Sequence, residues 1–115
     1  MSMIFSYGYN DLSQHPNPAD TVLFDCRDIP EPKLMQSGLD EKVRHEVMSS
    51  EEAQDMVTQA TGVAMQGRFD VAFMCTVGFQ RSVALAQETA DRCRALGVEV
   101  EVEHRSLDEV FKNVV

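Results

Sequence analysis

The sequence predicts an α/β fold: a single three-layer domain with a mainly parallel sheet of about four strands flanked by helices. Short apolar runs of strand length alternate along the chain with longer segments whose apolar residues recur at helical spacing. The run at 71–74 is wholly apolar, which is typical of a buried strand. The 115 residues suffice for one hydrophobic core, so we expect one domain over residues 1–115.

Four segments have the composition of strands. Residues 3–7 alternate and are rich in aromatic side chains, and residues 21–25 form a nearly continuous apolar run that predicts a strand buried on both faces. Residues 71–74 follow as the central strand. Residues 98–104 alternate valine with glutamate, so we expect a half-buried edge strand whose glutamates face water.

Helix signals and a loop separate these strands. The prolines of segment 10–20 predict a loop between the first two strands. Asp40 is a candidate cap for a short helix. Ser49 and Glu52 form a capping box that predicts an amphipathic helix over about residues 50–66, ended by Gly67.

A second long helix is predicted from Ser82, and Gly97 ends it. A further capping box that begins at Ser106 predicts a short final helix. The residues expected on the core-facing side of the long helix are Val83, Ala86, Ala90, Cys93 and Leu96.

Composition and charge exclude several classes of protein. The formal net charge is -9 and the pI is about 4.6, so the surface repels polyanions and nucleic acid is disfavoured as a partner. No apolar run approaches the ~20 residues of a membrane span, and the N-terminus lacks the features of a signal peptide. We therefore expect a cytoplasmic protein with no membrane partner.

The three cysteines fit neither a disulfide framework nor zinc-binding pairs, because they are odd in number and widely spaced. Reduced thiols are the simplest interpretation for Cys26, Cys75 and Cys93, and Cys93 reads as a small core residue. His15 and His45 have no partner at metal-ligand spacing, so we predict neither a metal site nor a cofactor.

The stretch 75–82 has the sequence CTVGFQRS and joins the central strand to the helix that begins at Ser82. Backbone N–H groups at a helix N-terminus lack intrahelical partners and carry partial positive charge, so this position favours an anion. Gly78 permits a tight turn of the loop, and Arg81 supplies a permanently charged, bidentate donor. We therefore predict an anion-binding loop.

The spacing C-x-x-G-x-x-R-S resembles the signature loop of cysteine-dependent phosphatases. In that interpretation Cys75 is the nucleophile, Arg81 binds the phosphoryl oxygens and Ser82 assists departure of the thiolate. Asp28 is the candidate general acid; the other acids considered are Asp11, Asp20 and Asp25. Met74 stands where many such phosphatases have histidine.

A second resemblance is to rhodanese-like sulfurtransferases. The segment LFDCR at 23–27, followed later by a cysteine loop and an alanine-rich helix, is similar to the arrangement in that family. Its loop usually has fewer residues between cysteine and arginine than separate Cys75 from Arg81. Both resemblances keep an enzyme as an alternative hypothesis.

A third resemblance covers most of the chain and is to the RapZ C-terminal domain. It rests on segments that occur in the family's order: FSYGY at 5–9, LFDCR at 23–27, GLD at 38–40, the loop at 75–83 and VEHR at 102–105. The family loop usually reads C-T-G-G-x-H-R-S, so Val77 replaces a glycine and Gln80 replaces a histidine. Met3 already begins the pattern, so we expect a stand-alone version without the family's N-terminal nucleotide-binding domain.

The resemblance implies a domain that senses a small anionic ligand, an amino-sugar phosphate such as glucosamine-6-phosphate. It also implies an RNA partner, which the net charge disfavours. Charged side chains at the carboxyl ends of neighbouring strands extend the same rim. The ligand-binding residues expected from the loop and this rim are Arg27, Thr76, Gly78, Gln80, Arg81, Ser82, His104 and Arg105.

Each candidate residue also has a purely structural interpretation. Cys75 is either a nucleophile or a buried thiol at a strand end, and Arg27 and Asp28 either line the site or pair at the surface. His104 is either a ligand residue or a lone surface histidine. A third hypothesis, an acidic protein that binds another macromolecule, rests on net charge alone.

Overall fold

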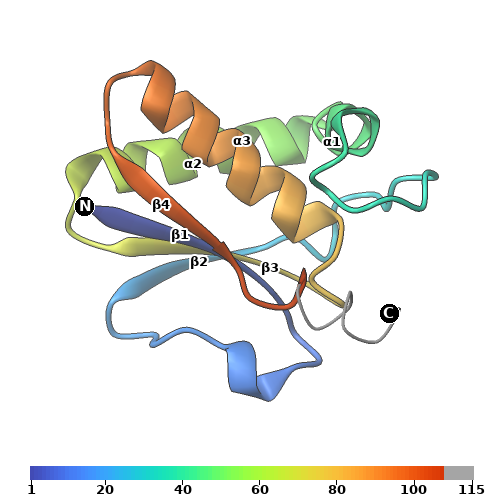
Figure 1. Cartoon of the computed structure of the whole chain (residues 1–115), viewed down its shortest axis with the longest axis horizontal. Helices are drawn as coiled ribbons and strands as arrows, with labels where there is room; N and C mark the ends of the chain where they lie inside the picture. Colours follow the sequence, from blue (N-terminus) through green and yellow to red (C-terminus); the bar gives the residue numbers. More distant parts are fainter. Residues whose placement is uncertain (108–115) are drawn as a thin grey trace.

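The computed structural model describes residues 1–107 and contains one sheet whose four strands run parallel (Figure 1). Its strands are β1 (Ser2–Gly8), β2 (Thr21–Asp25), β3 (Asp70–Cys75) and β4 (Val100–His104). Their order across the sheet is β2-β3-β1-β4, so β3 and β1 are central. The predicted α/β class with a parallel sheet of four strands is confirmed.

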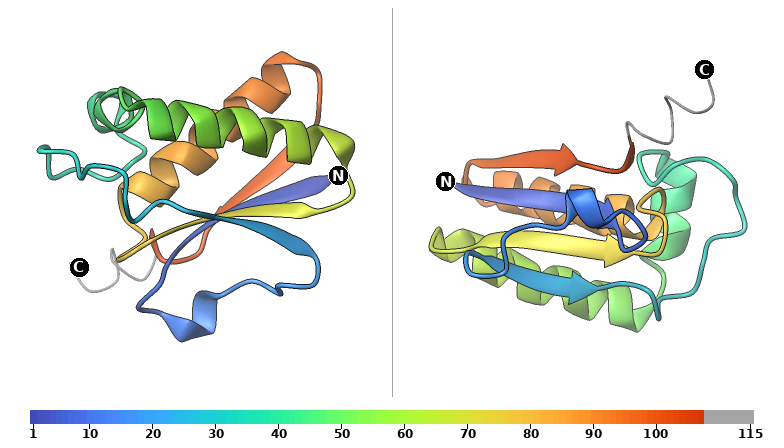
Figure 2. Two further views of the ribbon diagram at one scale, coloured as in Figure 1. Left: turned by 180° about the vertical axis from the view of Figure 1, so that it is seen from behind. Right: turned by 90° about the horizontal axis from the view of Figure 1, so that it is seen from below.

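Helices cover one face of the sheet (Figure 2, left). They are α1 (Glu41–Val47), α2 (Glu51–Gln66) and α3 (Arg81–Ala95). The connection between β1 and β2 crosses the opposite face and contains the short 3-10 helix η1 (Leu12–Gln14). The His15 ring of this connection lies 4.8 Å from the Tyr7 ring, so the connection packs on that face of the sheet.

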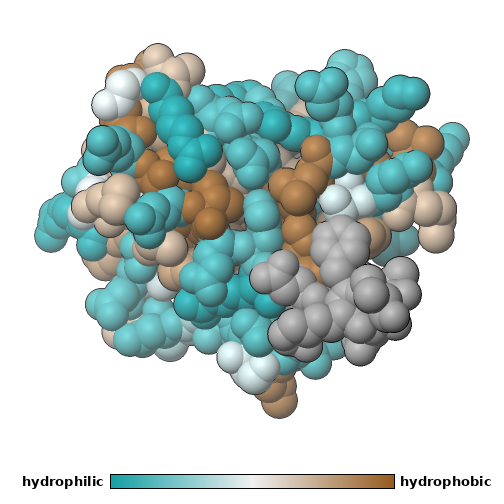
Figure 3. Space-filling view, viewed as in Figure 1, coloured by the Kyte–Doolittle hydropathy of each residue, from teal (hydrophilic) through white to brown (hydrophobic). Residues whose placement is uncertain are grey.

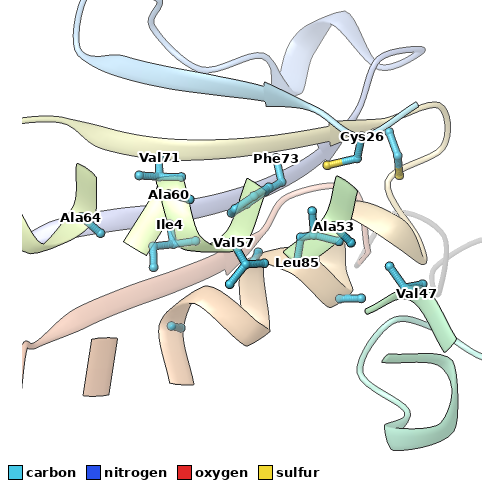
Figure 4. Close-up of a cluster of buried hydrophobic side chains, with 14 of the residues drawn as sticks. Ile4, Cys26, Val47, Ala53, Val57, Ala60, Ala64, Val71, Phe73 and Leu85 are labelled. Carbon is cyan, nitrogen blue, oxygen red and sulfur yellow. The ribbon is translucent and has the colours of Figure 1, made fainter. Parts of the chain in front are cut away.

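The core lies between the sheet and the helices (Figure 4). Alternate residues of the central strands point to opposite faces, so Ile4, Val71 and Phe73 pack under the helices whereas Phe5 and Tyr7 pack on the other side. The helices contribute mainly small side chains, which allow close approach to the sheet. These helix residues are Ala53, Val57, Ala60, Ala64, Ala84, Leu85, Ala86 and Ala90.

The prediction that β2 is buried on both faces is wrong. β2 is an edge strand, and Leu23 at its centre is 49% exposed. An apolar run reports local composition, but the position of a strand in the sheet depends on which strands pair with it. The prediction of an edge position for β4 is confirmed, and its Glu101 and Glu103 are exposed.

Two local predictions also need correction. Ser50 is the N-cap of α2 and accepts a hydrogen bond from the Ala53 N–H, whereas the predicted cap, Ser49, donates to the Glu46 carbonyl. Leu96 was expected in the core but is 60% exposed, because α3 ends at Ala95 and the chain turns there. The final helix predicted from Ser106 falls largely on residues 108–115, outside the described residues.

Other helix boundaries agree with the sequence. The Asp40 carboxylate accepts hydrogen bonds from the N–H groups of Lys42 and Val43 at the start of α1. Gly67 ends α2 in the left-handed conformation, with φ 69°. Within residues 1–107, no helix combines the length and the apolar character that crossing a membrane requires.

The corrected cap predicts different effects for two neighbouring serines. Replacing Ser50 by alanine removes the acceptor for the Ala53 N–H, so we expect a loss of about 1 kcal/mol in the free energy of unfolding. Ser49→Ala is the matched control, because the Ser49 hydroxyl donates to the Glu46 carbonyl of α1 and makes no hydrogen bond to α2. Urea denaturation measures both variants, and a larger loss for Ser49→Ala would contradict the assignment.

Candidate anion-binding site

The loop between β3 and α3 lies at the carboxyl edge of the sheet, where all four strands end (Figure 2, right). Because the strands are parallel, the segments that follow β1, β2 and β4 reach this same edge. The Tyr9 N–H donates to the Cys75 carbonyl at 2.8 Å, and the Asn10 N–H donates to the Thr76 carbonyl. The segment that follows β1 is therefore hydrogen-bonded to the start of the loop.

The Cys75 side chain is held inside the loop. The thiol is 3% exposed, and its Sγ accepts a hydrogen bond from the Gly78 N–H at 3.2 Å. The buried Ser82 hydroxyl lies 3.1 Å from the same sulfur. The loop is thus wrapped around the sulfur atom, which links the end of β3 to the first turn of α3.

Two glycines allow the loop to contact the end of β1. Gly78 has φ 82°, and a Cβ at this position would lie 2.4 Å from the backbone N of Gly8. A Cβ at Gly8 would lie 2.3 Å from the Val77 carbonyl oxygen. Ser106, after β4, completes the contact by accepting a hydrogen bond from the Gly8 N–H at 2.9 Å.

The Arg81 side chain is buried, and the residue is only 7% exposed. Its guanidinium binds the segment that follows β2. Its Nη1 donates to the carbonyl oxygens of Arg27, at 2.7 Å, and Ile29, at 3.1 Å. Its Nη2 donates to the carboxylate of Glu31 at 3.2 Å. The side chain that the sequence assigned to a ligand therefore already has an internal carboxylate as partner.

Gln80 binds a later part of the connection between β2 and α1. Its Nε2 donates to the carbonyl oxygens of Leu34 and Gln36 at 2.7 and 2.8 Å. Gly38 packs on the loop itself: its N–H donates to the Phe79 carbonyl, and a Cβ there would lie 2.2 Å from the Gln80 carbonyl oxygen. Gln80 and Arg81 therefore fix the connection between β2 and α1 over the N-terminus of α3.

Arg27 lies just after β2 at the carboxyl edge of the sheet and forms an ion pair with Asp25. It forms hydrogen bonds to both carboxylate oxygens of Asp25, and its guanidinium lies 4.6 Å from the centre of the Tyr9 ring. The side-chain hydrogen bonds from Arg27 lower the pKa of Asp25. Burial, followed by the charge of Asp25, raises the pKa of Tyr7. Asp25 is thus held as a carboxylate that pairs with Arg27.

His104 and Arg105 point to different sides of β4. The Nδ1 of His104 lies 2.7 Å from the buried Ser6 hydroxyl, and its Nε2 lies 3.4 Å from Gln87 Oε1. The Arg105 guanidinium lies 4.1 Å from the centre of the Phe5 ring and donates to the Gln14 carbonyl. These contacts direct Arg105 toward the connection between β1 and β2.

The remaining candidates are dispersed. Thr76 and Asp28 are exposed, at the mouth of the loop and after β2 respectively. Asp11 accepts a hydrogen bond from Ser13, and Asp20 accepts one from Asn17. Among residues 1–107 no group of three histidine, cysteine or acidic side chains could hold a metal ion.

Sequence reasoning missed four contributors to this site. Gly8, Gly38 and Ser106 make close contacts with the loop, and Glu31 supplies the carboxylate next to Arg81. Gly8 carried a signal, because glycine in a strand often marks a close approach of another backbone. Glu31 carried none, since its role depends on the path of the chain after β2.

A profile of the RapZ C-terminal domain family matches residues 2–108, nearly the whole chain. The chain belongs to the RapZ C-terminal domain family. Membership confirms the resemblance inferred from the loop and from the segments around it. Val77 and Gln80, which depart from the usual family loop, lie within the matched range.

Relatives of this RapZ C-terminal domain are longer proteins named nucleotide-binding protein. The chain is 33% identical to one from Thermobifida fusca, with 90% of the chain and 40% of the relative covered. It is 36% identical to one from Bifidobacterium adolescentis (92% and 38%) and 29% identical to one from Ruminiclostridium cellulolyticum (99% and 42%). The chain thus spans about two fifths of the length of these relatives.

The contact between Gly78 and β1 predicts a marked loss of stability in Gly78→Ala. Both Gly78 and Gly97 have left-handed backbones, so alanine at either should cost about 1–2 kcal/mol in the free energy of unfolding. Only at Gly78 does the added methyl meet backbone atoms, which adds about 1–3 kcal/mol. Chemical denaturation of the two variants isolates the contact, and equal losses would contradict it.

Proposed function

We propose that this RapZ C-terminal domain binds a small anion, a sugar phosphate in particular, through loop 75–82 at the N-terminus of α3. The proposal covers the single domain of residues 1–115 and a cytoplasmic location. Family membership supports it, since the resemblance implies sensing of an amino-sugar phosphate.

The observation that carries the proposal is the placement of the loop. It joins the carboxyl end of a central parallel strand to the first turn of a helix of 15 residues. This is the position at which open α/β sheets bind ligands, and the helix N-terminus favours negative charge there. Exposed Thr76 and Val77 lie at the mouth of the loop, within reach of solvent.

Arg81 supports anion binding by its positive charge and because its carboxylate partner, Glu31, can be replaced. The Glu31 side chain is 74% exposed, although it pairs with a buried guanidinium. An exposed carboxylate is exchangeable, because an ion pair open to water contributes little to stability. A phosphate that approaches the loop can therefore replace Glu31 at Nη2 while the carbonyls of Arg27 and Ile29 keep Nη1 in place.

Thermal unfolding tests the proposal. We expect inorganic phosphate and glucosamine-6-phosphate to raise the melting temperature, because a ligand that binds only the folded state adds about 2.7 kcal/mol at 100 times its Kd. A nucleoside monophosphate and sulfate distinguish the preferred class of anion. If none of these anions shifts the unfolding transition, the proposal is wrong.

Two variants that each replace a glutamate by neutral glutamine sharpen this test. Glu31→Gln removes the carboxylate that competes for Arg81, so we expect phosphate to bind several-fold more tightly. Glu41→Gln, on the exposed first turn of α1, is the matched control and should leave the Kd unchanged. Isothermal titration measures both. Arg81→Ala is less informative alone, because it also releases the segment after β2.

The cysteine-phosphatase and sulfurtransferase alternatives have less support from the geometry. The Gly78 N–H and the Ser82 hydroxyl surround Cys75 as such a mechanism requires. However, the donors of Arg81 are engaged by Arg27, Ile29 and Glu31, and the thiol is buried.

Hydrolysis of an aryl phosphate distinguishes binding from catalysis. We expect the wild-type protein and Cys75→Ser to show the same background rate, because Nη1 and Nη2 of Arg81 already donate to Arg27, Ile29 and Glu31. Turnover of aryl phosphate that Cys75→Ser abolishes would establish the enzyme instead. Transfer of sulfur from thiosulfate to cyanide tests the sulfurtransferase in the same pair of proteins.

RNA as a partner has weaker support than a small anion. The net charge is -9, and six of the seven arginines form ion pairs with acidic side chains. Hydrophilic residues cover most of the face seen in Figure 3, and hydrophobic ones show in separate patches. Binding of RNA needs unpaired cations that contact successive phosphates, so the small anion is the ligand we propose.

A further inference from the structure

We propose that Cys26 and Cys75 form an oxidisable pair, a modification site at which peroxide links the end of β2 to the anion-binding loop by a disulfide. This inference does not depend on which ligand the loop binds. It rests on the relative position of two thiols that stand 49 residues apart in the sequence.

The strand register places the two residues side by side. Asp25 of β2 pairs with Met74 of β3, so the next pair along the parallel strands is Cys26 and Cys75. The Cys26 N–H donates to the Met74 carbonyl at 2.7 Å, which extends the parallel hydrogen-bond pattern to this pair. Neighbouring strands lie about 4.8 Å apart, within the range of about 4.4–6.8 Å between Cα atoms joined by disulfides.

Both side chains are on the same face of the sheet. Cys26 and Cys75 belong to the hydrophobic cluster under the helices, and Figure 4 shows Cys26 directed into that cluster. Their proximity also appears in their electrostatics: burial, and next the charge of Cys75, strongly raise the pKa of Cys26. Cys93 lies in the same core on α3, but no strand register pairs it with either thiol.

The two thiols have different roles in the oxidation. Cys75 reacts first, because it lies at the loop, where its sulfur accepts a hydrogen bond from the Gly78 N–H. Its thiolate attacks one oxygen of hydrogen peroxide, and the O–O bond breaks to give Cys75 sulfenic acid and water after protonation. The sulfur of Cys26 then attacks the sulfenic sulfur, the S–O bond breaks, and a second water leaves with the Cys26 proton.

The disulfide would alter the loop. In the reduced protein, Cys75 Sγ accepts from the Gly78 N–H and lies beside the Ser82 hydroxyl. A sulfur bonded to Cys26 has no S–H group to donate to the Ser82 hydroxyl, so this contact at the start of α3 is lost. Oxidation therefore acts on the segment that we propose as the anion site, and a thiol reductant restores the loop.

The experiment treats the folded full chain with hydrogen peroxide, blocks residual thiols with an alkylating agent before unfolding, and measures intact mass and tryptic peptides. We expect a loss of two hydrogen atoms in the wild-type protein and a linkage between peptides 1–27 and 69–81, which contain Cys26 and Cys75. Dithiothreitol should reverse both. Cys93→Ser is the matched control and should form the same linkage.

Variants assign the order of the steps. Cys26→Ser should stop at Cys75 sulfenic acid, a gain of one oxygen atom that dimedone traps, whereas Cys75→Ser should gain neither the oxygen atom nor the linkage. The proposal is overturned if the folded wild-type protein forms no linkage between peptides 1–27 and 69–81. It is equally overturned if the linkage involves peptide 93–94, or if it forms only after the protein is unfolded.

Discussion

The buried guanidinium of Arg81 is the interaction on which the carboxyl edge of the sheet depends. A charge removed from water is costly unless hydrogen bonds replace its hydration. Here the carbonyls of Arg27 and Ile29 and the carboxylate of Glu31 replace it. The segment after β2 therefore cannot leave without exposing polar groups, and the start of α3 is held against it. Gln80 extends the same connection toward α1.

This engagement of Arg81 separates binding from catalysis at the loop. Thiol-dependent phosphoryl transfer requires an arginine whose donors face the phosphoryl oxygens next to the nucleophile. In this domain Nη1 of Arg81 donates to backbone carbonyls and Nη2 donates to an exchangeable carboxylate. In the proposed complex an anion would replace Glu31 at Nη2 and would lie at the helix N-terminus, which favours negative charge. The geometry thus favours recognition over chemistry.

The acidic surface is compatible with the proposed anion site because electrostatic effects are local. Salt screens charges beyond about 8 Å at physiological ionic strength, so distant glutamates on α2 and β4 have little effect at the loop. Ion pairs on the surface neutralise most arginines individually, for example Arg44 with Glu88 and Asp91.

The amino-acid pattern was sufficient to predict the α/β class, the four strands, the helix starts at Asp40 and near Ser50, and the loop as the candidate site. These follow from local periodicity, capping and turn chemistry, which act over a few residues. The resemblance to the RapZ C-terminal domain added the family, which the profile match confirms. Local signals failed for Ser49 and Leu96, because adjacent residues can compete for one cap and a helix can end one residue early.

Contacts between residues far apart in the sequence became known only from the folded chain. The strand order β2-β3-β1-β4 put β2 at an edge and brought Cys26 beside Cys75. It also gave Arg81 its partner, Glu31, which no pattern in the chain had indicated. Pairing between strands is set by packing and register over the whole sheet, and neither is encoded within a short window of sequence. The loop was therefore predictable as a segment, whereas the engagement of its arginine and the neighbour of its thiol were not.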